Sequence, residues 1–215
     1  MARGISTKTL LEKKYKTFEF DGSFKELFGN PEKGGCWLIY GAEKNGKTQF
    51  ALQLAKYLAS FEKVRYISAE EGTGKNFQDS AARAGLNDKD TNIIFTDYEP
   101  LEELEKQLAN RKGPKIVLVD NITVYNDELK NGIMRKLLKK YENITFIFLA
   151  HEEKNEPYTA TAKMCKKLAQ IIIRVVGLTA FIGGRCPGGE YQVIEAKSNL
   201  YHGTQIKEKQ HEHNS

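Results

Sequence analysis

Long apolar runs are missing from this chain of 215 residues. No stretch approaches the roughly 20 apolar residues that a membrane-spanning helix needs, and the N-terminal sequence MARGISTKTLLEKKYK lacks the apolar core of a signal peptide. We therefore expect a cytoplasmic protein without a membrane partner. With 40% hydrophobic residues the chain can bury one core, and its length gives no reason to expect two domains.

Cysteines are few, and neither sign of charge dominates. Cys36, Cys165 and Cys186 are odd in number and show no C-x-x-C spacing, which argues against a disulfide framework and a zinc site. The net charge is +5 and the isoelectric point is near 8.9. A surplus this small fits contact with nucleic acid but is equally common in proteins that never touch it.

Short runs rich in β-branched and aromatic residues alternate with segments of helical period. The expected strands are residues 36–41, 64–68, 92–97, 115–120 and 144–150, and the expected helices are residues 47–60, 75–84, 100–111 and 126–141. The strand runs are almost wholly apolar, as in strands covered on both faces. This alternation predicts an α/β fold, with a mainly parallel central sheet and helices on both faces.

The pattern changes after Ala150. A polar stretch precedes a short expected helix at 164–169, and three strands are expected at 170–176, 178–185 and 190–197. The last two are joined by Cys-Pro-Gly-Gly, a strong turn signal, so a C-terminal β-hairpin should extend the sheet. The expected division is a flexible or subunit-contacting segment at 1–25, the core domain at 26–204 and a disordered polar tail at 205–215.

A phosphate-binding loop is the strongest local signal. GAEKNGKT fits G-x-x-x-x-G-K-[ST] between an apolar strand and a helix, which is the context that makes this motif credible. Glycines let the backbone N–H groups turn toward a β-phosphate, and the lysine adds charge at the β- and γ-oxygens. The predicted ATP-binding residues are Gly41, Ala42, Glu43, Lys44, Asn45, Gly46, Lys47, Thr48 and Gln49.

A magnesium site and a catalytic base follow from the same reasoning. The Thr48 hydroxyl is expected to ligate Mg²⁺, and Asp120, which closes the run KIVLVD, to hold the metal's water shell. Asp120 could instead cap a turn. The next residue is Asn121 rather than a glutamate, so we expect the base at the end of another strand. Glu70 is the candidate and Glu71 the fallback, although the two could form a plain surface pair.

Together these motifs resemble the RecA-type ATPase core shared by RecA, RadA, KaiC proteins and DnaB-type helicases. The similarity is strongest to RadA-like and phage-borne RecA-like ATPases, over residues 24–55, 64–86 and 147–175, and it spans roughly residues 22–203. It implies a RecA-like P-loop NTPase fold with ATP and Mg²⁺ as cofactors. It also implies that His151, at the end of ITFIFLA, senses the γ-phosphate, although a strand-capping histidine is the alternative.

The resemblance also implies contributions from other molecules. Lys197 would reach the γ-phosphate of a neighbouring subunit in a ring or filament, while the arginine of the related motif is absent because Asn199 or Leu200 stands there. Arg185 and Lys163 are possible substitutes, and an ordinary solvated lysine is the alternative for Lys197. Residues 152–163 correspond to a mobile DNA-binding loop, but their mixed charge makes them a weak phosphate-contacting surface.

The leading hypothesis is an ATPase that assembles on single-stranded DNA in recombination, repair or replication, with hydrolysis stimulated by DNA or by assembly. The alternative is an ATP-dependent conformational switch or assembly factor for a protein partner, with hydrolysis indifferent to DNA. A small-molecule kinase is disfavoured, because Arg174 and Arg185 are too few for an arginine-rich lid and both fall in expected strands.

Overall fold

The computed structural model describes the backbone of residues 4–212 and the side chains of residues 4–203. A nine-stranded sheet runs through this part of the chain in the order β3-β2-β4-β5-β1-β7-β8-β9, with the short β6 paired to β5. The strands are β1 Gly35–Gly41, β2 Val64–Ser68, β3 Ile93–Thr96, β4 Ile116–Asp120, β5 Thr145–Glu153, β6 Glu156–Pro157, β7 Ile171–Val176, β8 Thr179–Gly184 and β9 Gly189–Gln192.

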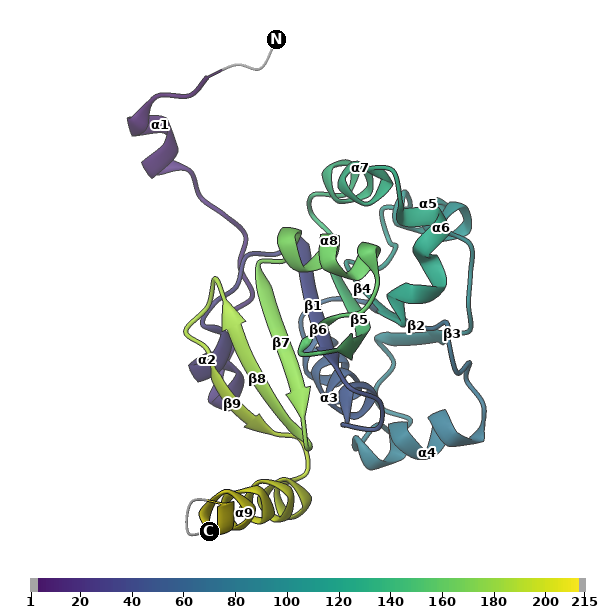
Figure 1. Ribbon diagram of the computed structural model, residues 1–215. Coiled ribbons are helices and arrows are strands. Elements are labelled where there is room, and N and C mark those ends of the chain that lie inside the picture. Colours follow the sequence, from purple (N-terminus) through teal and green to yellow (C-terminus); the bar gives the residue numbers. More distant parts are fainter. Residues whose placement is uncertain (1–3, 213–215) are drawn as a thin grey trace.

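Helices cover both faces of the sheet (Figure 1). They are α1 Thr7–Glu12, α2 Gly22–Phe28, α3 Lys47–Leu58, α4 Lys75–Arg83, α5 Leu101–Leu108, η1 Ile122–Tyr125, α6 Asn126–Leu129, α7 Ile133–Lys140, α8 Ala160–Leu168 and α9 Glu195–Glu212. One apolar core joins α2, α3 and α4 to the sheet, and a second joins α5 to α8 to it. The mainly parallel α/β fold predicted from the sequence is confirmed.

The parallel strands form around β1, which lies between β5 and β7. Its side chains from Cys36 to Tyr40 are buried, which explains an apolar run without alternation. Beyond β7 the sheet continues antiparallel through β8 and β9, as expected of the C-terminal hairpin. The last expected strand, 190–197, is too long, since β9 ends at Gln192 and α9 begins at Glu195.

Local backbone geometry accounts for a second difference, in the helix expected at 126–141. It is broken into α6 and α7, because Asn131 and Gly132 adopt left-handed φ angles of 55° and 83°. Asparagine and glycine are the residues that tolerate this region. The period of the apolar residues is helical on both sides of the break, so the pattern alone does not reveal it.

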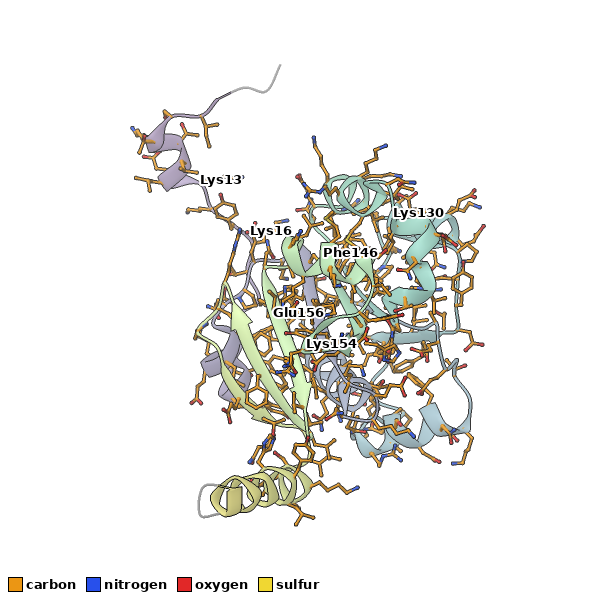
Figure 2. All side chains as sticks on the ribbon, in the orientation of Figure 1. Lys13, Lys16, Lys130, Phe146, Lys154 and Glu156 are labelled. Atoms are coloured by element: carbon orange, nitrogen blue, oxygen red, sulfur yellow. The ribbon has the colours of Figure 1, made fainter. Side chains whose placement is uncertain are left out.

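A tight hairpin replaces the mobile loop expected at 152–163. Strand β5 continues to Glu153, the chain turns at Lys154 and Asn155 with φ of 52° and 65°, and β6 returns antiparallel. Thr159 then caps α8, since its hydroxyl accepts a hydrogen bond from the Ala162 N–H at 3.1 Å. Figure 2 shows Lys154 and Glu156 in this region. The backbone of this segment is therefore partly paired in a hairpin, although its polar composition suggested a loop.

The N-terminal segment is only partly separate from the core. Phe18 and Phe20 are buried, and Phe24 of α2 stacks on Tyr57 of α3 at 4.4 Å between ring centroids. The packed domain therefore begins near residue 17, earlier than the boundary expected at residue 26. Only the preceding arm with α1 stands away from the body (Figure 1), and none of the α1 residues is buried.

The tail expected at 205–215 also differs. Helix α9 continues to Glu212, and residues 213–215 lie outside the described residues. Lysine, glutamate and glutamine have good helix propensity, so a backbone helix does not require the apolar face that this segment lacks.

Replacing Phe18 with alanine should lower the free energy of unfolding by about 3–5 kcal/mol, because a fully buried ring would leave a cavity in the core. Urea unfolding followed by circular dichroism measures the change. The matched control is Leu11→Ala on α1, whose side chain is exposed and whose loss should change stability by less than about 0.5 kcal/mol. Equal effects of the two substitutions would contradict the assignment of Phe18 to the core.

Candidate functional site

The carboxyl ends of four parallel strands meet around one cavity of about 500 Å³. Strand β1 leads into the loop between Gly41 and α3, and β5 places His151 beside Gly41 in the strand register. Strand β4 ends at Asp120, while Glu70 follows β2. The cavity wall includes these predicted residues: Glu43, Lys44, Gly46, Lys47, Thr48, Gln49, Glu70, Glu71, Asp120 and His151.

The loop before α3 is held in a tightly packed conformation. Gly46 has a left-handed φ of 97°, and a Cβ at this position would lie 2.5 Å from Leu178 Cδ2. At Gly41 a Cβ would lie 2.2 Å from the Val175 carbonyl oxygen. Glycine is therefore required at both ends of the loop, as the motif predicts.

Lys47 lies folded over the loop. Its side chain is largely buried, with 7% exposed, and Nζ donates a hydrogen bond to the Ala42 carbonyl oxygen at 2.8 Å. Burial lowers the pKa of Lys47, while the nearby charges of Asp120 and Glu70 oppose this shift. The site thus contains a cation whose main partner is a neutral carbonyl, which an anion could replace.

Thr48 and Asp120, the two residues predicted from the sequence to hold a metal ion, are in contact. Thr48 Oγ1 donates a hydrogen bond to Asp120 Oδ2 at 2.8 Å, and the buried Tyr66 hydroxyl donates to the same oxygen at 2.9 Å. Burial raises the pKa of Asp120 to about 6, although both hydrogen bonds act against this rise. Tyr66 was not expected here, and its phenol fixes the orientation of the carboxylate.

Glu70 and His151 also meet. His151 Nε2 lies 3.0 Å from both carboxylate oxygens of Glu70. The Nδ1 atom of the same ring is buried without a hydrogen-bond partner among the described residues. The sequence marked both residues separately, and the structure brings them together because β2 and β5 flank β4.

A family model described as iSTAND, inactive STAND, matches residues 19–157, which is more than half of the chain. The chain belongs to the iSTAND family. The iSTAND match begins next to Phe18, close to where the packed domain starts in the structure. A search of curated proteins finds no match.

Two archaeal structures resemble this iSTAND protein in fold. The flagellar accessory protein FlaH from Methanocaldococcus jannaschii is 16% identical, with a TM-score of 0.60, and the alignment covers 83% of this chain and 92% of FlaH. The KaiC-like protein PH0186 from Pyrococcus horikoshii OT3 is 18% identical, with a TM-score of 0.60 and coverage of 83% and 94%. The fold of the iSTAND protein is thus that of RecA-like P-loop ATPases, as the sequence resemblance implied.

The candidates for action on a neighbouring subunit lie elsewhere in the iSTAND protein. Lys197 is exposed in the first turn of α9 and does not line the cavity of its own chain. Lys163 on α8 and Arg185 after β8 are also exposed and outside it. Asn199, one of the two residues that stand where the related motif has an arginine, accepts a hydrogen bond from Gln192 Nε2 at 2.7 Å.

Four cavity residues of the iSTAND protein were missed from the sequence. They are Ser80 and Arg83 on α4, Leu178 in the turn between β7 and β8, and Ile194 just before α9. Ser80 and Arg83 lie three residues apart in the helix expected after Glu70, so they share one face of it. This helical spacing could have identified them. Leu178 and Ile194 come from the C-terminal strands, and only the order of strands in the sheet places them beside the loop.

The described part of the iSTAND chain contains no group of three or more His, Cys, Asp and Glu that could hold a metal ion. A magnesium ion held by one or two protein ligands, phosphate oxygens and water needs no such group. None of the described helices is both long and apolar enough to cross a membrane.

The buried carboxylate of Asp120 predicts a pH-dependent stability. Because the folded-state pKa is about 6 and the ordinary value is 3.8, the folded state holds this proton more tightly, and stability falls as pH rises through this interval. One pKa unit corresponds to about 1.4 kcal/mol, so the loss between pH 4 and pH 7 should be at most roughly 3 kcal/mol. Part of the residue is exposed, which reduces the effect.

Asp120→Asn keeps the shape of the side chain and removes the titration. Urea unfolding of the nucleotide-free protein should therefore show the variant gaining stability over the wild type as pH rises from 4 to 7. If the free energies of unfolding of the two proteins changed with pH in parallel, the Asp120 carboxyl group would not be the cause of the pH dependence.

Proposed function

We propose that this protein binds ATP with Mg²⁺ in the cavity at the carboxyl end of the sheet and acts as a nucleotide-dependent switch. The observation that carries the proposal is the contact between Thr48 and Asp120, 2.8 Å apart, beside a loop that bends around glycines. These two oxygens suit a hard cation, which prefers oxygen ligands. Mg²⁺ would neutralise phosphate charge there, and Lys47 would move from the Ala42 carbonyl to phosphate oxygens.

A buried amide and the end of a helix support an anionic ligand at this cavity. The Gln49 Nε2 atom is buried without a partner among the described residues, although its side chain lines the cavity. The N–H groups of residues 42–46 precede the N-terminus of α3, where the helix dipole favours negative charge. A triphosphate would therefore meet the Gln49 amide and the N–H groups that precede the helix.

We assign Glu70 as the group that orients a water molecule for hydrolysis and His151 as its positioning partner. The hydrogen bond between them supports this pairing, because a change at His151 on γ-phosphate loss would act directly on Glu70. The family description "inactive" supports slow hydrolysis. An exposed Lys197 could contribute charge to a neighbouring copy's cavity in a homo-oligomer, so hydrolysis would depend on assembly.

The hairpin at 152–157 favours a protein-directed switch over action on DNA. Arg174 pairs with Glu152 at 2.7 Å, and Lys166 pairs with Glu156 at 2.8 Å, so the acidic and basic groups satisfy each other. Little positive charge is left to bind phosphates. DNA-directed ATP hydrolysis in recombination or repair is the second candidate. It is favoured by the lysines of the exposed arm, among them Lys13 and Lys16 (Figure 2).

Lys47→Ala should weaken ATP binding at least tenfold, because charged hydrogen bonds contribute about 1.5–3 kcal/mol each. Isothermal titration calorimetry with Mg²⁺ and ATP measures the affinity. The matched control is Lys136→Ala, which removes an exposed lysine of α7 and should leave binding unchanged. Failure of the wild type to bind ATP would refute the proposal.

Hydrolysis separates the two candidate functions. With the switch, turnover of the wild type is slow, is lost in Glu70→Gln and does not respond to single-stranded DNA, while ATP binding by Glu70→Gln persists. Stimulation by single-stranded DNA that is lost with Glu70→Gln would instead establish the DNA-directed function.

A further inference from the structure

Asn45, in the middle of the phosphate-binding loop, holds the turn between β7 and β8. Its side-chain Oδ1 accepts a hydrogen bond from the Gly177 N–H at 2.7 Å, and its carbonyl oxygen accepts one from the Leu178 N–H at 3.1 Å. Its Nδ2 donates to the Glu43 carbonyl oxygen at 3.0 Å. A single asparagine thus connects the loop to a turn that is 132 residues away in the sequence.

The turn itself is fixed in an unusual conformation. Gly177 and Leu178 have left-handed φ angles of 52° and 62°. A type I′ hairpin turn requires such angles at both central residues, but a leucine adopts them at a cost. The Leu178 side chain packs against Gly46 and lines the cavity. Contacts on both sides therefore hold the turn in place, and a ligand in the cavity would touch it.

Helix α9 is built onto the other side of this turn. The Tyr201 ring covers Gly177 so closely that a Cβ there would lie 2.0 Å from Tyr201 Cδ1. Ser198 Oγ and Thr179 Oγ1 form a buried hydrogen bond of 2.5 Å. Ile194, the residue before the helix, lines the cavity. Figure 1 shows α9 beyond the end of the sheet at which β7 ends and β8 begins.

We propose that α9 is an output helix whose packing depends on occupancy of the phosphate-binding loop, with Asn45, the 177–178 turn and Tyr201 as the connection. The proposal rests on nucleotide binding at this loop and adds the element that reports it. A nucleotide that orders the loop N–H groups fixes Asn45 and hence the turn and the first turns of α9. Because such coupling is reciprocal, a protein that binds α9 changes nucleotide affinity by the same factor.

Hydrogen exchange of residues 195–203 in the full chain tests the coupling. Saturating Mg²⁺ and ATP should slow exchange of this segment at least about fivefold in the wild type, the lower limit of typical couplings. Tyr201→Ala should abolish the slowing and weaken ATP binding by a similar factor. Tyr201→Phe keeps the ring over Gly177 and should restore both effects, while Tyr15→Ala, on the exposed arm, should behave as the wild type.

The outcomes separate this proposal from nucleotide binding. If ATP binds the wild type in calorimetry but exchange at 195–203 stays unchanged, the coupling is refuted and the switch function is not. If ATP slows exchange equally in the wild type and in Tyr201→Ala, the route through Tyr201 is refuted. If no ATP binds at all, both proposals fail, and the calorimetric result identifies that case.

Discussion

The pairing of β1 with β5 on one side and β7 on the other is the constraint on which the site depends. This one strand leads into the phosphate-binding loop at Gly41. Pairing with β5 sets His151 beside Gly41, and pairing with β7 brings the β7–β8 turn against Asn45 and Gly46. Since parallel strands end at the same edge of a sheet, residues distant in the sequence converge there. The buried apolar side chains of β1 stabilise these strand pairings, and they therefore also determine where the residues around the cavity lie.

Local patterns in the sequence were sufficient for the parts of the fold that depend on local interactions. The loop motif identifies itself because glycine, lysine and threonine each meet a separate physical need at a fixed spacing. The strands β1 to β5 were found as apolar runs. In β1, β2 and β4 almost every side chain is buried, as expected of strands covered on both faces. Asp120 was predicted to lie beside Thr48 from its position at the end of such a strand, and the structure puts the two side chains in contact.

Features that depend on long-range contacts could not be read in this way. The burial of Phe18 and Phe20 is determined by partners such as Phe61, so a segment with little periodicity is nevertheless part of the core. The 152–157 hairpin is stabilised by Arg174 and Lys166, whose pairing with Glu152 and Glu156 no local pattern shows. Likewise, Tyr66 lies in the middle of β2 like an ordinary core residue, and its contact with Asp120 follows from the register of β2 and β4.

In the proposed function, different residues bind the nucleotide and act in its hydrolysis, and this division would reconcile an intact phosphate-binding loop with a family described as inactive. Lys47 and Thr48 lie in the first turn of α3, and Asp120 ends β4. Lys47 donates a hydrogen bond to the Ala42 carbonyl oxygen, and Thr48 donates one to Asp120. Glu70 lies beyond β2 in a more exposed position, and its carboxylate is already engaged by His151. At the proposed site, the hydrogen bond from His151 would compete with a water molecule for the Glu70 carboxylate. The proposed arrangement would favour a long-lived triphosphate-bound state, which a nucleotide-dependent switch requires.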